Sequence, residues 1–133
     1  MVIPHSQMFA PRSFAVEATR KSIRAMYYHC RVPSIAVSEY TLNKIETVPK
    51  LIIVPAARVL TDSCWQALLS AANRGATVAI TGVIDEDEHW RRVERTSRFG
   101  WSSTTEPVLD SEVIRIGLRE TIVRFEGEKL QRI

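Results

Sequence analysis

The chain has 133 residues, a length that suits one domain and leaves no room for a second sizeable core. Hydrophobic residues make up 45% and charged residues 25% of it, as in ordinary globular proteins. Lys and Arg exceed Asp and Glu by only 18 to 15 and are spread along the chain, so the net charge of +3 argues against nucleic acid as a partner. We expect a single domain, residues 1–133, that binds no nucleic acid.

The first half of the chain alternates predicted strands with one long predicted helix. A short apolar run predicts a strand over Val2–His5, and apolar residues three or four apart predict a helix over Phe14–Arg31. Pro33 ends that helix, because the residue before a proline is disfavoured in the α region. A second strand is predicted over Ser34–Ser38, and Glu39–Lys50 reads as a connection with one helical turn.

The clearest pattern is a strand, a helix and a second strand. Leu51–Val54 is a continuous β-branched run, typical of a strand covered on both faces in a parallel sheet. Thr61 is a predicted N-cap, and Gly75 is suited to the positive φ that ends a helix. Thr77–Thr81 resumes as a buried strand. The predicted helix between them has one apolar stripe, formed by Trp65, Leu68, Leu69 and Ala72.

The last third predicts a helix and a hairpin. Asp85–Val93 has an acidic start and basic later residues, which favours a helix by its dipole. Phe99–Pro107 is rich in Ser, Thr and Gly and predicts an exposed loop. Val113–Ile116 and Thr121–Phe125 predict the two strands of a β-hairpin, and residues 126–128 a tight turn. The fold class expected is therefore α/β, with a mostly parallel sheet and a C-terminal antiparallel hairpin extension.

Two groups of residues could suggest a reactive site, and both favour a structural interpretation. The acidic cluster Asp85–Glu88 with His89 resembles a metal site or a carboxylate pair, but consecutive helix residues point in different directions. Cys64 lies in the first turn of a predicted helix, where the dipole can lower the pKa of a thiol, yet no histidine has a spacing that makes it the base. We expect no catalytic residue and no metal site.

The ends of the predicted strands offer a candidate pocket. No glycine-rich phosphate loop follows any strand, so no nucleotide or other cofactor is expected. Residues 54–57 occupy the place of a nucleophile turn and supply no nucleophile. Ser38, Pro55 and Gly82 mark a candidate pocket at the carboxyl ends of the strands. Among the tryptophans, Trp65 is expected in the core and Trp101 is a candidate exposed contact.

No segment points to a membrane or to export. The opening residues lack a basic region followed by an apolar stretch, and no apolar run approaches the roughly 20 residues that span a bilayer. Cys30 and Cys64 lie far apart, outside any CxxC pattern, as expected for small core residues of a reduced protein. We therefore expect a cytoplasmic protein without a membrane partner.

Five segments together resemble the β-galactosidase trimerisation domain, of the class I glutamine-amidotransferase-like superfamily. The resemblance lies in Lys50–Ala56, Val59–Asp62, Ala67–Leu69, Arg74–Val78 and Thr81–Gly82, and the tail Phe125–Ile133 adds to it. It implies a flavodoxin-like three-layer sandwich that follows a catalytic (β/α)8 barrel in a longer glycoside hydrolase. The catalytic glutamates of such enzymes belong to the barrel, so no catalytic residue is carried over, and the Cys-His-Glu triad of the amidotransferases is missing.

The resemblance implies a role in assembly. This chain is then a non-catalytic oligomerisation or interaction domain, and its partner is a second copy or a neighbouring catalytic barrel. Two alternatives stay open. One is a small-molecule-binding amidotransferase-like domain that uses the pocket at Ser38, Pro55 and Gly82, and the other is an enzyme that uses Cys64.

Overall fold

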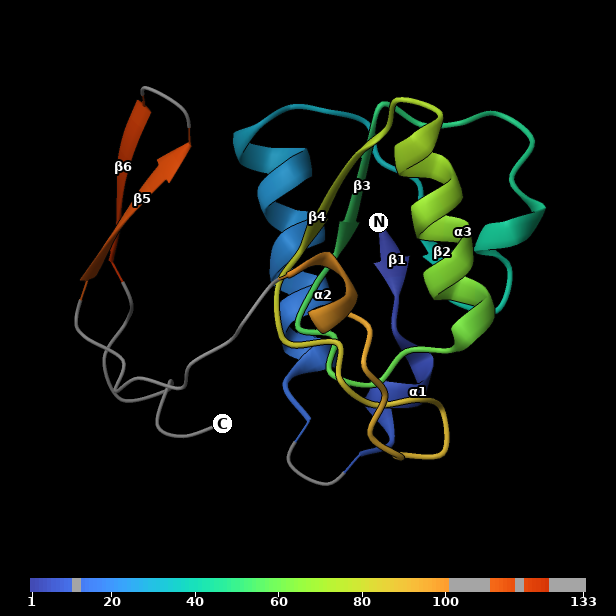
Figure 1. The fold of residues 1–133 in the computed structure, drawn as a ribbon. Coiled ribbons are helices and arrows are strands. Elements are labelled where there is room, and N and C mark those ends of the chain that lie inside the picture. The colour runs from blue at the N-terminus through green and yellow to red at the C-terminus, as the bar shows by residue number, and fades with distance from the viewer. Residues whose placement is uncertain (11–12, 101–110, 117–118, 125–133) are drawn as a thin grey trace. The chain divides into compact units, whose positions relative to one another are not determined.

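The computed structural model describes residues 1–10 and 13–100 with their side chains, and the backbone of residues 111–116 and 119–124. These residues belong to two units, Met1–Ser102 and Ser103–Ile133. The elements of the first unit are, in chain order, β1 (Val2–Ile3), α1 (His5–Met8), α2 (Ala15–Arg24), the π-helix η1 (Ala25–His29), β2 (Val37–Ser38), η2 (Leu42–Lys44), β3 (Leu51–Val54), α3 (Asp62–Asn73), β4 (Thr77–Ile80) and η3 (Ser97–Phe99) (Figure 1).

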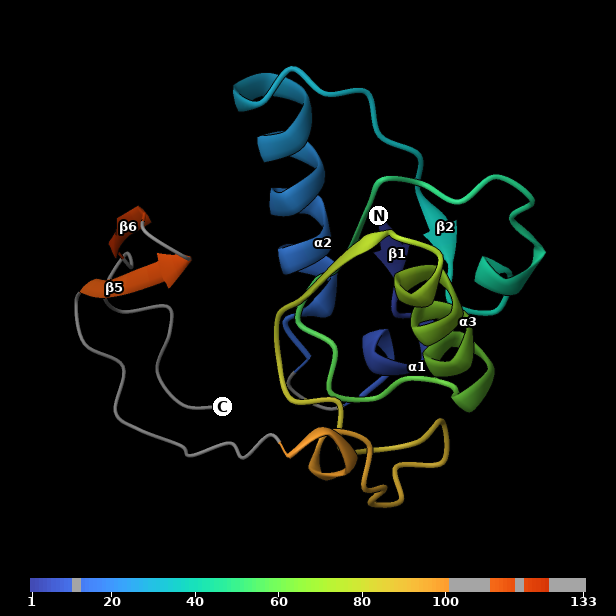
Figure 2. The same cartoon turned by 45° about the horizontal axis from the view of Figure 1, so that its top comes forward.

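The strands of the first unit are short and pair in parallel. Strand β1 pairs with β2, with Val2 opposite Val37. Strand β3 pairs with β4 from Leu51 opposite Thr77 to Val54 opposite Ile80. Strand β1 also contacts β3, and it lies between β2 and the β3–β4 pair (Figure 2). The unit is therefore a small α/β fold with two small parallel sheets, which confirms the predicted class.

The predicted order of strand, helix and strand is confirmed, including both ends of the helix. The burial predicted for the second strand is wrong, because no residue of β4 is buried and two of its four are exposed. The Thr61 hydroxyl accepts a hydrogen bond from the Cys64 backbone N–H at 3.2 Å, as an N-cap does. Gly75 has a φ of +96°, a conformation that side chains disfavour, so the chain can turn there into β4. Local capping chemistry therefore sets the bounds of α3.

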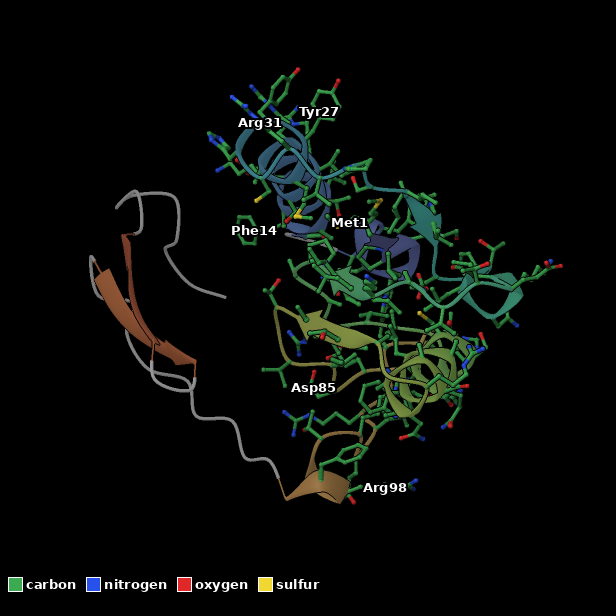
Figure 3. All side chains as sticks on the ribbon, turned by 90° about the horizontal axis from the view of Figure 1, so that it is seen from above. Met1, Phe14, Tyr27, Arg31, Asp85 and Arg98 are labelled. Carbon is green, nitrogen blue, oxygen red and sulfur yellow. The ribbon has the colours of Figure 1, made fainter. Side chains whose placement is uncertain are left out.

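The hydrophobic core lies between the strands and α3. Ile52 and Val54 of β3 are buried towards it, whereas Leu51 on the other face is 43% exposed. Helix α2 lies on the opposite side of the strands from α3 (Figure 3), and only Ala15 and Thr19 of α2 are buried. The prediction that the β3 strand is covered on both faces is therefore only half right. The core residues include Val2, Leu42, Ile52, Val54, Leu60, Cys64, Trp65, Leu68, Ala71, Ala76 and Ile84.

Several predicted boundaries and burials are wrong, for local reasons. The first strand ends at Ile3 because Pro4, which has no N–H to donate, precedes α1. The predicted long helix changes to π geometry at Ala25, so its apolar stripe does not continue as one face. On α3, Ala72 is exposed and Ala71 is buried instead. Cys30 is exposed, contrary to the core position expected for it.

The predicted helix over Asp85–Val93 is wrong. The segment folds back on itself: the Val93 N–H donates to the Asp85 carbonyl and the Asp87 N–H to the Arg91 carbonyl, both at 2.9 Å. One carboxylate oxygen of Asp87 accepts from the backbone N–H groups of His89 and Arg91, at 2.8 and 2.9 Å. An aspartate that bonds its own following backbone favours a turn over a helix.

The second unit contains the predicted hairpin. Strands β5 (Ser111–Ile116) and β6 (Arg119–Arg124) pair antiparallel, from Ser111 opposite Arg124 to Ile116 opposite Arg119. Trp101, most of the predicted loop over Phe99–Pro107 and the predicted turn at residues 126–128 lie outside the described residues. No helix in the described part of the chain has the length and apolar character needed to cross a membrane.

Candidate functional site

The structure brings two of the three predicted pocket residues together. Strands β3 and β4 end side by side, and their ends are joined through Thr81: its carbonyl accepts from the Ala57 N–H at 2.9 Å and its hydroxyl from the Ala56 N–H at 2.8 Å. Pro55 is fully buried next to this junction. Gly82 is so close to it that an added Cβ would lie 2.8 Å from the Ala57 carbonyl oxygen. This end of the sheet is therefore closed by backbone contacts.

Ala56 stands at the turn after β3 in a strained conformation. Its φ is +47°, in the left-handed region that residues other than glycine seldom adopt. A nucleophile presented after a parallel strand commonly sits on such a strained turn. Here the side chain is a methyl group, so the turn has the geometry of a nucleophile turn without a reactive atom.

The third predicted residue, Ser38, has different neighbours. Its Oγ lies 2.9 Å from Nδ1 of His5, and it accepts from the Tyr40 backbone N–H at 3.2 Å. The rings of His5 and Tyr40 stack with centroids 6.0 Å apart, and the Tyr40 hydroxyl lies 3.1 Å from Oγ of Ser6. A serine nucleophile needs a histidine that a third group orients. Within the described residues no carboxylate contacts His5, so this group is a polar cluster and not a triad.

Beneath this cluster, Glu39 is a buried carboxylate that the sequence analysis missed. Only 1% of its surface is exposed. One oxygen accepts from the Ser6 backbone N–H at 2.5 Å, and the other accepts from the Thr61 backbone N–H at 3.0 Å. Glu39 therefore ties the start of α1 to the N-cap of α3, and both of its oxygens serve the backbone.

Gln7 and Arg95 are two further buried polar side chains near the strand ends. The Gln7 side-chain oxygen accepts from the Val59 N–H at 2.9 Å. The Arg95 guanidinium donates to the carbonyl of Leu60 at 2.8 Å and to that of Glu86 at 3.0 Å. The signal that could have found part of this network is the place of Glu39, a charged residue directly after the strand β2. Arg95 had no such signal.

Cys64 is buried and held in its neutral form. Burial, assisted by the nearby Glu39 carboxylate and opposed by Arg95, raises the pKa of the Cys64 thiol to about 12. The thiolate is the nucleophilic form of cysteine, so Cys64 is inert near neutral pH. The possibility that the helix dipole lowers this pKa is therefore wrong, because desolvation exceeds the dipole effect here.

The two cysteines are expected to react very differently with iodoacetamide. At about pH 8, the exposed Cys30 should be alkylated quickly, and the buried Cys64 only when the protein is unfolded. Mass spectrometry should show one added group on the native protein. It should show two added groups on the protein unfolded in guanidinium chloride. The matched control is Cys30→Ser, which should take up no group while native. Fast labelling of native Cys30→Ser would contradict the burial of Cys64.

The acidic cluster does not converge on a common point. Glu86 is paired with Arg58 at 2.6 Å, and Asp87 uses its oxygens on the backbone and on the Arg91 side chain, at 3.1 Å. Hydrogen bonds from the Arg91 and His89 backbone lower the pKa of Asp87 below its usual value. In the described part of the chain, no three His, Cys, Asp or Glu side chains gather as metal ligands would.

A cavity of about 400 Å³ lies away from the strand ends, between residues 42–49 and α3. Its lining includes Ile52 of β3, Ser70 and Ala71 of α3, and Arg74, which directly follows α3. None of Ser38, Pro55 or Gly82 lines it. The predicted pocket residues and this cavity therefore belong to different parts of the unit.

Comparison of the chain with models of known protein families, with curated proteins and with solved structures gives no match.

Proposed function

We propose that this chain is a non-catalytic oligomerisation or interaction domain of a cytoplasmic β-galactosidase-like glycoside hydrolase. The single observation that carries the proposal is the exposure of three apolar side chains, Phe9 directly after α1 and Phe14 and Val16 at the start of α2, called here the apolar corner. These side chains are 81%, 42% and 55% exposed, and Phe14 projects away from the strands in Figure 3. Large apolar side chains left exposed within a short stretch of chain suit contact with another protein surface.

The chemistry of the strand ends supports the same proposal. The turn after β3 presents the methyl group of Ala56, and Cys64 is buried and neutral. Glu39 and Arg95 are engaged with backbone groups, as a scaffold requires and a catalytic site does not. We further propose a flavodoxin-like three-layer sandwich, supported by the parallel strands and by helices on both of their sides (Figure 1).

The test is the mass of the purified chain as a function of concentration. Light scattering after gel filtration should show self-association that the double variant Phe9→Ser, Val16→Ser weakens at least tenfold, because each buried apolar side chain contributes about 1.5–3 kcal/mol. Ile35→Ser, which alters an equally exposed residue (80%) outside the corner, is the matched control and should associate like the wild type. A monomer at every concentration would contradict self-association, and turnover of a nitrophenyl galactoside would contradict a non-catalytic role.

A second candidate function is the binding of a small molecule. The cavity beside α3 is lined by apolar side chains such as Ile45 and Ile52 together with polar ones such as Gln66 and Arg74, which favours a ligand with an apolar body and one acidic group. Screening such acids by thermal shift, with Arg74→Ala as the comparison, tests this candidate. Stabilisation that Arg74→Ala abolishes would support it.

A further inference from the structure

The end of α2 and the π-helix η1 carry an exposed basic surface. Residues 1–38 contain five Arg and Lys residues and a single acid, Glu17, which is paired with Lys21 at 3.2 Å. Arg20 and Arg24 are exposed and lie one turn apart on α2, and Arg31 is exposed after η1. These three arginines take part in none of the ion pairs found in the described residues. Within the described residues, no acidic side chain neutralises their charge.

Two tyrosines stand next to these arginines. Tyr27 and Tyr28 are 65% and 67% exposed, and their rings are perpendicular, with centroids 5.1 Å apart. They add little to the core, because neither side chain is buried. Each ring offers a flat apolar face to solvent, which suits stacking with another ring.

The backbone of residues 25–31 also has an unusual conformation. π-helical geometry is rare and is often found at functional sites. Arg31 has a φ of +51°, a strained value for a residue other than glycine. Figure 3 shows Tyr27 and Arg31 side by side, projecting away from the strands. They line a hollow of about 430 Å³ together with Tyr28, Val32 and Pro33.

We infer that this surface, formed by Arg20, Arg24, Tyr27, Tyr28 and Arg31 and called here the Arg–Tyr surface, binds a single strand of nucleic acid. The arginines neutralise phosphates, and a base stacks on a tyrosine in the hollow. A single strand is favoured over a duplex, whose bases are already stacked on one another. The carboxylate side chains of an acidic polypeptide would pair with the arginines but offer no aromatic ring to the tyrosines.

A nucleic-acid-binding surface is not what the net charge of the chain predicts. The total of +3 hides an uneven distribution: residues 1–38 have five basic residues and one acid, whereas the rest of the chain has 13 basic and 14 acidic residues. What steers a polyanion is the local density of charge and not the total. The exposed tyrosines then add the stacking that charge alone does not provide.

The experiment measures fluorescence anisotropy of a labelled oligothymidine of about ten nucleotides, from about 50 to about 200 mM salt. Tyr28→Ala should weaken binding about tenfold at each salt concentration and leave the salt slope unchanged, since a base loses its stacking partner. Arg24→Ala should lower the slope by about 0.7, the value for one phosphate contact of a single strand. Tyr28→Phe, which keeps the ring, should restore the affinity.

The matched control is Arg98→Ala, which alters an exposed arginine of η3 outside the Arg–Tyr surface, and it should bind like the wild type. A labelled polyglutamate of equal charge should bind weakly and without regard to Tyr28. Equal affinity for polyglutamate and oligothymidine would assign the surface to an acidic protein and overturn the inference. An equal effect of Arg98→Ala and Arg24→Ala, or no binding at low salt, would overturn it as well. Circular dichroism checks that each variant is folded.

Discussion

Replacing Glu39 with alanine is expected to lower the free energy of unfolding of the first unit by about 3–5 kcal/mol, because two buried backbone N–H groups lose a carboxylate acceptor. The N–H groups of Ser6 and Thr61 donate to its two oxygens. With Glu39 only 1% exposed, water cannot readily replace the lost acceptor. Urea unfolding followed by circular dichroism measures the change.

Two further variants separate the lost hydrogen bonds from the lost volume. Glu39→Gln fills the same space but can accept only one of the two hydrogen bonds at its amide oxygen, so we expect about half the loss. Glu46→Ala removes an exposed carboxylate and should stay within about 0.5 kcal/mol of the wild type. If Glu39→Ala were no less stable than Glu46→Ala, Glu39 would not join α1 to α3 as described.

The part of the fold that could be predicted from the sequence is governed by local chemistry. The β-branched run of β3, the Thr61 cap and the turn at Gly75 act within a few residues of one another, and each was found where it was expected. The same holds for the β5–β6 hairpin. Such local signals fix which segments form elements and where helices begin and end.

What could not be predicted depends on partners far along the chain. Glu39 bonds residues 33 and 22 positions away, and Arg95 bonds the Leu60 carbonyl 35 positions away. No periodicity identifies such pairs. The acidic run after Ile84 fails for the same reason: Glu86 bridges to Val59, and Asp87 caps the turn behind it, so long-range pairing overrides helix propensity.

In the candidate site, too, local features could be predicted from the sequence and long-range contacts could not. Ser38, Pro55 and Gly82 do lie at strand ends, which the sequence order predicts. Their side-chain neighbours depend on how the short sheets sit against α1 and α3, and no local pattern encodes that. The Arg–Tyr surface was not predicted because the pattern of residues 14–31 indicates one continuous helix. Over a single turn, the sequence pattern of a π-helix differs little from that of an α-helix.

Replacing Arg95 with methionine is expected to destabilise the first unit by about 2–4 kcal/mol, because the carbonyl oxygens of Leu60 and Glu86 lose their shared donor. Arg95 is 4% exposed, and its two hydrogen bonds add to the backbone bonds between Leu60, Glu86 and Arg58 that hold the segment after β4 to the start of α3. Arg95→Lys should recover only part of the loss, since an ammonium group lacks the planar fork that reaches two carbonyls at once. Unfolding in urea again gives the difference.

The ion pair that Arg95 makes with Asp62 should account for little of this loss. The Arg95 Nη2 lies 2.5 Å from Asp62 Oδ1, but the Asp62 side chain is 71% exposed, so solvent screens the attraction. Asp62→Ala should therefore cost no more than about 1 kcal/mol, and the coupling energy of a double-mutant cycle should be of the same size. A coupling as large as the whole effect of Arg95→Met would mean that the salt bridge, and not the two carbonyl contacts, holds the segment in place. The small coupling energy expected here would instead show that Arg95 acts mainly through its hydrogen bonds to the carbonyls of Leu60 and Glu86. These two bonds explain why an arginine is buried at this position.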